Sequence, residues 1–570
     1  MKYSKIPLAQ TVAFLCQEKG IKNIVISPGS RNAPLTISFT ENPFFKTFSI
    51  VDERCAAFFA LGMAQQFQKP VALVCTSGSA LLNYYPAIAE AFYSDIPLVV
   101  LSADRPIERI DIGDGQTIRQ KNVFENHILY SANLYSELVL EGTPQNEKLA
   151  QKQVESRKHN AQEINHALNA AIERNGPVHI NIPFYEPLYT KVDSLSVAPI
   201  VIKPNAKPIF DTSNIGEFIN EWTAAKRKLV LVGVSKPNAV LQPYLNILAE
   251  DDSVIVLTET TSNIHHPKFF NCIDQLIGSL NDDEFKALQP DILLTFGGMV
   301  VSKKIKAFLR HYQPKHHWHI DEKKAFNTYF CLDKHFQTSP NIFFDSFLKN
   351  YQPQSSEYFA HWDAIRNLRK QKHEAYLNTI DFSDFKAFEK IFPAIPDNYQ
   401  LQLGNSSTIR YAQLFNINNS LTIFCNRGTS GIEGSTSTAI GAAVATNRPT
   451  VLLTGDLSFF YDSNALWNDY IPNNFRIIVI NNGGGGIFRI LPGDKGSDDF
   501  STYFETTHKH TAALLCSMYG FGYQSVNDEQ GLVENLDDFF LESDSPKLLE
   551  IATPRITNDL VLLEYFKAVK

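Results

Sequence analysis

The sequence lacks long apolar runs and paired cysteines. No stretch of about 18 consecutive apolar residues occurs, so the sequence predicts no transmembrane helix. Only 7 of the 570 residues are cysteine. None stands in a Cys-x-x-Cys pair and several lie in apolar runs, which favours reduced, buried thiols. The first residues show an amphipathic helical pattern rather than the apolar core of a signal peptide, and we therefore expect a cytoplasmic protein.

A large excess of charge of one sign is also missing. The chain has 52 basic and 60 acidic residues, with a net charge of −8. This balance gives no reason to expect nucleic acid or a membrane surface as a partner. Hydrophobic residues make up 44% and charged residues 20%, which is ordinary for a globular protein.

Short apolar strands alternate with helical stretches along the whole chain. This alternation predicts an α/β protein with doubly wound, mostly parallel sheets. The chain length and two polar stretches, at 183–208 and about 351–377, favour three domains. We place them at 1–188, 189–350 and 351–570. The predicted strands lie at 24–26, 71–75, 98–101, 178–182, 229–233, 254–257, 292–297, 317–321, 421–425, 451–454, 477–480 and 548–551.

Two polar clusters each follow an apolar, β-rich run directly. Thr454–Ser458 (Thr-Gly-Asp-Leu-Ser) follows one run, and Asn481–Gly484 (Asn-Asn-Gly-Gly) follows the next. Because ligands bind beyond the carboxyl ends of parallel strands, we expect Asp456 and Asn482 to lie side by side at one sheet edge. A carboxylate, an amide oxygen and a glycine-rich backbone suit Mg²⁺ that also takes phosphate oxygens. The alternative for each cluster alone is a simple turn.

The two clusters together resemble the diphosphate-binding signature of thiamine diphosphate (ThDP) enzymes, with Leu457 in place of its second glycine. Six further blocks are similar, in order, to one family, the 2-succinyl-5-enolpyruvyl-6-hydroxy-3-cyclohexene-1-carboxylate synthases of menaquinone biosynthesis. These blocks are Ser27–Pro34, Cys75–Ala80, Ser102–Pro106, Gln116–Gln120, Asn426–Gly434 and Gly483–Phe488. The resemblance implies that the three domains are pyrimidine-binding, central and diphosphate-binding.

The resemblance also implies an activity and its cofactors. It implies a transferase that uses ThDP and Mg²⁺, which Mn²⁺ can replace. Such an enzyme decarboxylates 2-oxoglutarate and adds the resulting enamine to isochorismate in a 1,4 fashion. In this architecture the Glu53 domain of one subunit faces the Asp456 domain of another, so at least a homodimer is implied. Homodimer and homotetramer both stay open.

The residues that match the family's cofactor site are distributed over the first and last domains. The resemblance assigns the metal to Asp456, the Asn482 side chain and the Gly484 carbonyl. Glu53 matches the glutamate that shares a proton with the aminopyrimidine ring, and the alternative for it is a helix-capping acid. The other matching cofactor positions are Ser406, Gly428, Ile432, Gly455, Leu457, Ser458 and Ile487.

Both implied substrates are dicarboxylates, which arginine binds through its bidentate fork. The matching cations are Arg31, Arg105, Arg410, Arg427 and Lys303, helped by the polar Ser30, Gln116 and Ser406. Lys304 stands where the family often has arginine, so its role is open. Ile487, Phe488 and Leu491 are expected to form an apolar wall that excludes water. The alternatives are surface ion pairs for the arginines and core packing for the apolar residues.

Two other functions compete with this interpretation. An acetolactate-synthase-like enzyme or a simple 2-oxo-acid decarboxylase would share the fold and cofactor, but the blocks at 27–34 and 116–120 argue against it. A non-catalytic ThDP-binding or scaffold protein is expected to lack Glu53 or the pair of Asp456 and Asn482. The chain has all three residues, which favours an enzyme.

Overall fold

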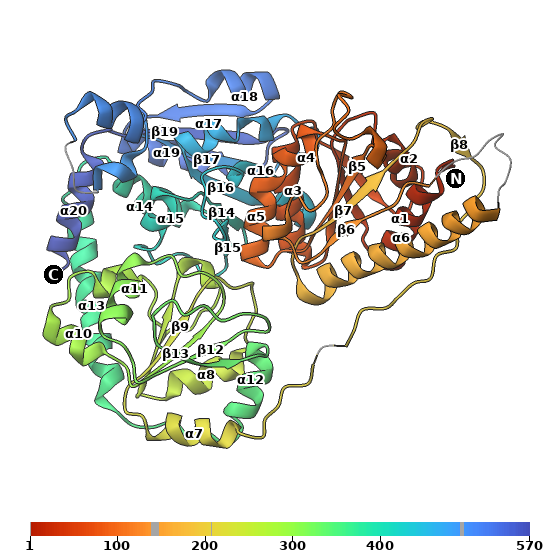
Figure 1. The fold of residues 1–570 in the computed structure, drawn as a ribbon. Coiled ribbons are helices and arrows are strands. Elements are labelled where there is room, and N and C mark those ends of the chain that lie inside the picture. The colour runs from red at the N-terminus through yellow and green to blue at the C-terminus, as the bar shows by residue number, and fades with distance from the viewer. Residues whose placement is uncertain (1, 138–146, 207, 491–494) are drawn as a thin grey trace. The chain divides into compact units, whose positions relative to one another are not determined.

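A computed structural model of the chain describes residues 2–137, 147–206, 208–490 and 495–570. The chain forms two compact units. The first contains residues 1–207, 428–448 and 460–475, and the second contains 208–427, 449–459 and 476–570. Three large, mostly parallel sheets with flanking helices are present, which confirms the predicted fold class (Figure 1). No helix among the described residues is long and apolar enough to cross a membrane.

The first unit is built on a six-stranded parallel sheet in the order β3-β2-β4-β5-β7-β6. Because β4 and β5 are buried along their whole length, helices must cover both faces. Apolar residues of α1, α2 and α6 cover one face, and α3, α4 and α5 lie on the other (Figure 1). The strands are β2 (Asn23–Ile26), β3 (Lys46–Ser49), β4 (Val71–Cys75), β5 (Leu98–Asp104), β6 (Ser131–Asn133) and β7 (Val178–Pro183), with a separate small antiparallel pair of β1 (Tyr3–Ser4) and β8 (Lys191–Val192). The helices are α1 (Pro7–Glu18), α2 (Ala33–Thr40), α3 (Glu53–Phe67), α4 (Ser79–Asn83), α5 (Tyr85–Ser94) and α6 (Glu147–Arg174).

A helix from the last third of the sequence belongs to the first unit. Helix α16 (Ser435–Thr446) packs along α3 through glycine on both helices. A Cβ atom added at Gly62 would lie 2.0 Å from the Thr438 carbonyl oxygen, and one at Gly441 would lie 2.0 Å from the Phe59 carbonyl oxygen. Side chains at these positions would separate the two backbones. The glycines therefore bring segment 428–448 into the first unit.

The second unit contains a five-stranded parallel sheet in the order β10-β9-β11-β12-β13. Alternate residues of its central strands face opposite sides: Val230 and Val232 pack with α7, α8 and α12, and Leu229 and Leu231 pack with α9, α10, α11 and α13. The strands are β9 (Lys228–Val232), β10 (Val254–Thr258), β11 (Ile292–Phe296), β12 (His316–Ile320) and β13 (Leu332–Phe336). The helices are α7 (Ile215–Ala224), α8 (Gln242–Glu250), α9 (Ile273–Ile277), α10 (Asp282–Leu288), α11 (Lys303–His311), α12 (Pro340–Phe347) and α13 (Glu357–Leu377).

A six-stranded sheet in the order β15-β14-β16-β17-β19-β18 completes the second unit. Helices α14, α15, α19 and α20 share an apolar core with its strands. The strands are β14 (Gln400–Leu403), β15 (Thr422–Cys425), β16 (Thr450–Gly455), β17 (Phe475–Asn481), β18 (Gly522–Val526) and β19 (Lys547–Ala552). The helices are α14 (Asp384–Ala394), α15 (Ser407–Ala412), α17 (Asp456–Tyr461), α18 (Ala513–Tyr519), α19 (Glu529–Phe539) and α20 (Asn558–Ala568).

Candidate functional site

The ends of β16 and β17 bring Asp456 and the Asn481–Gly484 cluster together. These strands are neighbours in the sheet, as the sequence predicts. Asp456 is 3% exposed and begins α17. Its Oδ2 accepts hydrogen bonds from the backbone N–H groups of Gly483, at 2.9 Å, and Gly484, at 3.0 Å. The carboxylate therefore holds the loop that follows the neighbouring strand.

The loop after β17 needs glycine for its backbone shape. Gly483 and Gly484 have φ values of +76° and +151°, which residues with a side chain rarely adopt. A Cβ atom at Gly484 would also lie 2.6 Å from the Glu505 carbonyl oxygen. These two glycines let the chain turn back over Asp456 and present backbone groups at the sheet edge.

The Asn482 side chain is oriented by a buried acid, Asp384, that the sequence did not single out. Asn482 Nδ2 donates to Asp384 Oδ2 at 3.0 Å. Asp384 is 2% exposed, and burial raises its pKa to about 6. The edge thus offers an Asp carboxylate, an Asn side-chain oxygen and glycine carbonyls, a set of oxygen donors that fits Mg²⁺.

Residues 505–508 lie against the same loop. The Glu505 carbonyl oxygen accepts a hydrogen bond from the Gly485 N–H at 2.6 Å. The Gly483 carbonyl oxygen accepts one from the His508 N–H at 3.1 Å. The His508 Nε2 atom lies 3.2 Å from Asp456 Oδ2, and this carboxylate raises the His508 pKa. No sequence pattern links these positions to Asp456, because they are distant in the chain.

The second unit also gathers three of the predicted cations. Burial lowers the Arg410 pKa, and the nearby charge of Arg427 lowers it further. Arg427 donates to Asn405 Oδ1 at 2.7 Å, and Arg410 donates to the Ser406 carbonyl oxygen at 2.6 Å. Ser406 itself has φ +68°, an unusual conformation at the start of α15. Burial lowers the pKa of Lys306, a further cation, and the charges of Arg427 and Lys303 lower it further.

The start of α11 is fixed by another buried acid, Glu259. Its two carboxylate oxygens accept the backbone N–H groups of Val301 and Ser302 at 2.6 and 2.7 Å. Burial raises its pKa to about 7. Lys303, the first residue of α11, is exposed. The Lys304 ammonium instead lies 4.1 Å from the centre of the Phe566 ring, a cation–π contact with α20.

The first unit gathers Arg31 and Arg105. Both are half-buried, and the charge of Arg105 adds to burial in lowering the Arg31 pKa. Arg31 donates to Glu186 Oε1 at 3.1 Å, and Arg105 donates to the Gly115 carbonyl oxygen through two nitrogens at 3.1 and 2.6 Å. Gln116 follows directly in a left-handed conformation with φ +55°. Ser30 is exposed and precedes Arg31 in the loop before α2.

Glu53 begins α3, and Asp52 rather than Glu53 caps the helix, accepting from the Cys55 N–H at 3.1 Å. Glu53 is half-buried. Burial raises the pKa values of Cys75 and Tyr84, and the negative charge of Glu53 raises them further. The Glu53 carboxylate is therefore not needed as the cap of α3.

The loop before α16 carries Gly428 and Ile432 and belongs to the same unit. Glu90, 1% exposed on α5, accepts from the backbone N–H of Gly428 at 2.8 Å and of Thr429 at 2.7 Å. The Ser94 hydroxyl donates to the same carboxylate at 2.7 Å. A buried acid thus fixes this loop as well.

The remaining predicted residues follow the strands as expected. Gly455 ends β16, and Leu457 and Ser458 continue in α17. Ile487 is half-buried and Phe488 is 37% exposed, its ring 6.2 Å from that of Phe504. Leu491 lies outside the described residues.

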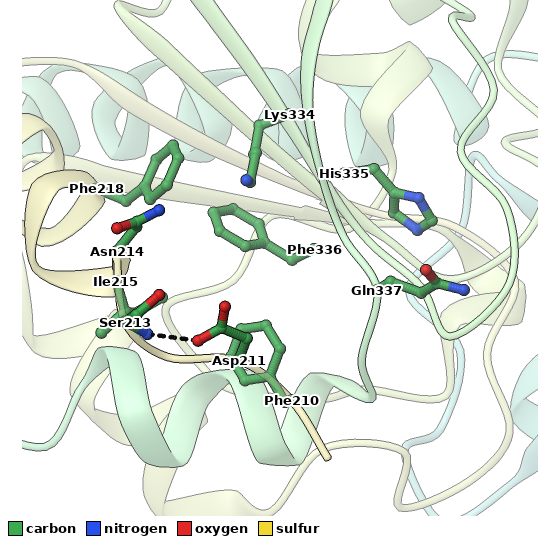
Figure 2. A pocket seen from close by; sticks show the side chains of 10 residues that line it. All are labelled: Phe210, Asp211, Ser213, Asn214, Ile215, Phe218, Lys334, His335, Phe336 and Gln337. Carbon is green, nitrogen blue, oxygen red and sulfur yellow. Dashed lines mark hydrogen bonds between the residues drawn. The ribbon is translucent and has the colours of Figure 1, made fainter. Parts of the chain in front are cut away.

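A hollow on the central sheet does not involve the candidate residues. It lies between β13 and the start of α7, and the Lys334 ammonium lies 5.0 and 5.5 Å from the ring centres of Phe218 and Phe336 (Figure 2). Its lining residues are Phe210, Asp211, Ser213, Asn214, Ile215, Phe218, Lys334, His335, Phe336 and Gln337.

Comparison with known proteins agrees with this arrangement. Three family models match: the N-terminal binding domain of thiamine pyrophosphate enzymes at 6–131, their middle domain at 213–403 and their C-terminal binding domain at 404–551. The chain is 63% identical to a 2-succinyl-5-enolpyruvyl-6-hydroxy-3-cyclohexene-1-carboxylate synthase from Christiangramia forsetii, and all of both chains is covered. The chain belongs to this synthase family. Identity is 56% to the synthase from Flavobacterium psychrophilum, again over both full chains, and 38% to that from Porphyromonas gingivalis, over 97% of this chain and 95% of the relative.

Membership of the synthase family confirms the ThDP-enzyme fold and the resemblance on which the site was predicted. The three buried acids that hold candidate residues of this synthase were missed. Asp384 and Glu259 look like ordinary polar residues at helix starts in the sequence. Glu90 did leave a signal, since it interrupts the apolar run Ala-Ile-Ala-Glu-Ala-Phe in α5.

Proposed function

We propose that the chain decarboxylates 2-oxoglutarate and adds the remaining four-carbon unit to isochorismate in a 1,4 fashion, releasing CO₂ and forming the compound for which its relatives are named. Menaquinone biosynthesis would use this product. The strongest support is the 63% identity to a synthase of that name over the full length of both chains.

The metal and cofactor assignments rest on the edge formed by β16 and β17. Asp456, the Asn482 side-chain oxygen and the Gly484 carbonyl would hold Mg²⁺, and Mn²⁺ is expected to replace it. Gly455, Leu457 and Ser458 would lie along the diphosphate. Bound ThDP supplies the electron sink that decarboxylation of a 2-oxo acid requires. Further cofactor contacts are proposed for Ser406, Gly428, Ile432 and Ile487.

Glu53 is proposed to hold a proton shared with a nitrogen of the aminopyrimidine ring. Its place supports this, because Asp52 already caps α3 and leaves the Glu53 carboxyl available. Its neighbours Cys75 and Tyr84 are fully buried and carry raised pKa values. Shelter from water is what a carboxyl needs to share a proton near neutral pH.

The four arginines are proposed to bind the substrate carboxylates. Arg31 lies near Arg105, and Arg410 lies near Arg427. Two like charges held close together repel each other, and a bound carboxylate between them relieves that repulsion. Each arginine is half-buried, so solvent screens its charge only partly. Carboxylate binding would be assisted by Lys303, Ser30, Gln116 and Ser406.

Ile487, Phe488 and Leu491 are proposed to exclude water from the reacting carbon, so that addition to the ring competes well with simple protonation. We also expect at least a homodimer, with homotetramer the alternative, and a cytoplasmic location. The three domain boundaries at 1–188, 189–350 and 351–570 stay a prediction.

Incubation of the protein with ThDP, Mg²⁺, 2-oxoglutarate and isochorismate tests the proposal. Mass spectrometry should detect the adduct of the four-carbon unit and isochorismate, in equal amount to released CO₂. Release of CO₂ with only a four-carbon aldehyde as product would favour the simple decarboxylase. Condensation of two 2-oxo acids would favour the acetolactate-synthase-like alternative.

A further inference from the structure

Asp384 is the first residue of α14 and is fixed at the sheet edge by contacts beyond that with Asn482. Its Oδ1 accepts from the Thr553 hydroxyl at 2.5 Å, and its backbone N–H donates to Asn558 Oδ1 at 2.8 Å. Thr553 in turn donates its backbone N–H to the Asn481 carbonyl oxygen at 3.1 Å, at the end of β17. Asp384, Thr553 and Asn558 are all at most 9% exposed. The acid is thus held rigidly relative to the loop that it contacts.

The contact with Asp384 determines which end of the Asn482 carboxamide faces the acid. A carboxamide has an oxygen that accepts and an NH₂ group that donates, and it can turn over to exchange them. An ionised carboxylate only accepts, so Asp384 Oδ2 selects the orientation in which Asn482 presents its NH₂ group. Within the described part of the chain, the Asn482 Oδ1 atom accepts no hydrogen bond. The oxygen is left for another partner.

A metal ligand of the asparagine type must present its oxygen, because the NH₂ group has no lone pair to offer. We propose that Asp384 is a positioning residue of the cation site, which holds the Asn482 carboxamide with its oxygen toward Mg²⁺. This inference rests on the proposed function of Asp456, Asn482 and Gly484 as metal ligands. Partners of this kind, which orient a ligand without touching the metal, usually change metal affinity about 10- to 100-fold when removed.

Binding of Mn²⁺ in the presence of saturating ThDP, measured by the electron paramagnetic resonance signal of free Mn²⁺, tests the proposal without a turnover assay. Asp384→Ala should weaken Mn²⁺ binding about 10- to 100-fold. Ser383→Ala is the matched control, because it removes the cap of the same helix, which accepts from the Lys386 N–H, and leaves Asp384 in place. Equal losses in both variants would show that Asp384 acts only through the start of α14 and would overturn the proposal.

A double-mutant cycle separates orientation from general structure. In an Asn482→Asp background both side-chain ends are oxygen, so there is no orientation to select. Asp384→Ala should then not weaken Mn²⁺ binding, because it also removes the repulsion between two neighbouring carboxylates, whereas a merely structural role would weaken binding equally in both backgrounds. Circular dichroism and unfolding temperature without metal establish that each variant is folded. If Asp384→Ala does not fold, Asp384→Asn keeps the volume and should cost about three- to tenfold, because its amide selects neither orientation.

Asp456→Ala separates the existence of the cation site from the role of Asp384 in it. If that variant binds Mn²⁺ as the wild type does, the proposed cation site is wrong. If it loses Mn²⁺ while Asp384→Ala keeps wild-type affinity, the cation site stands and the role of Asp384 is overturned.

Discussion

Single side chains at the candidate site are held mainly by backbone groups. The Asp456 carboxylate accepts N–H groups from Gly483 and Gly484, and Glu90 and Glu259 each accept two more from other loops. Charge-assisted hydrogen bonds of this kind are strong. Removal of one of these acids should therefore displace a loop as well as a charge.

Asp456→Ala should abolish stabilisation of the protein by ThDP and Mg²⁺. A ligand that binds only the folded state at about 100 times its Kd stabilises by about 2.7 kcal/mol. The measurement is the unfolding temperature with and without both ligands. Asp544→Ala, which changes an exposed acid, should keep the wild-type response. An undiminished response in Asp456→Ala would remove this residue from the cofactor site.

Glu53→Gln should keep ThDP binding and lose activation of the cofactor. The amide can still hydrogen-bond but cannot share a proton, so exchange of the cofactor's C2 proton should slow by orders of magnitude. Exchange into deuterated water, quenched by acid and read by NMR, measures this rate. Glu125→Gln is the control, an exposed glutamate of the same unit. A wild-type rate in Glu53→Gln would make Glu53 only a helix-start residue.

Arg410→Ala and Arg427→Ala should each lower kcat/KM for at least one dicarboxylate. Loss of one partner from a buried charged contact costs about 2–5 kcal/mol, or about 30- to 4000-fold at 1.4 kcal/mol per decade. ThDP binding should change little, and Arg310→Ala, an exposed position of α11, should stay near the wild-type value. Effects below threefold in both variants would mean that these arginines do not bind substrate.

Among helices and strands, the sequence predicted the strands that have a continuous apolar run and missed several that do not. All twelve predicted strands are present because each has an apolar run, such as Val71–Cys75 in β4. In the second unit, three strands were not predicted. The half-exposed edge strands β13 (Leu-Asp-Lys-His-Phe) and β18 (Gly-Tyr-Gln-Ser-Val) lack an apolar run and a period-2 pattern. The third, β14 (Gln-Leu-Gln-Leu), is buried inside its sheet, but its two glutamines interrupt the apolar run. The polar stretch at about 351–377 largely forms a helix, α13.

The stability of the protein should depend on pH because of Glu259, the acid that fixes the start of α11. Burial raises its pKa from 4.5 to about 7, so its neutral form is favoured in the folded state. This contribution to stability is fully present below pH 4.5 and is lost as pH rises through 7, on the order of 3 kcal/mol. Glu259→Gln has no carboxyl group to ionise, so it does not lose stability in this way as pH rises. The gap in unfolding temperature between wild type and variant should therefore shift in favour of the variant from pH 5 to 8. A gap that does not change with pH, like that expected for the exposed Glu250→Gln, would contradict the assignment.

In the whole molecule, each of the two compact units combines segments that are far apart in the sequence. Segment 428–448 lies far along the chain, yet the close packing of α16 on α3 places it in the first unit. Hydrophobic periodicity could not predict this contact, because it depends on where Gly62 and Gly441 allow two backbones to meet. The position of Asp456 at the end of a strand could be predicted from the local sequence. The supporting role of Asp384, Glu90 and Glu259 could not, because it depends on contacts between residues far apart in the chain.

In the assembled protein, each active site is predicted to use residues of two subunits. The first unit carries Glu53 and the second carries Asp456. If the site joins Glu53 of one subunit to Asp456 of another, the variants Glu53→Gln and Asp456→Ala should each be inactive alone and active together. After co-refolding or co-expression in equal amounts, half of the dimers are mixed, and one of the two sites in each mixed dimer has both wild-type residues. About a quarter of wild-type activity should return. Light scattering after size-exclusion chromatography should give the mass of at least a dimer for each preparation. A dimeric mixture with no recovered activity would mean that Glu53 and Asp456 act within one chain.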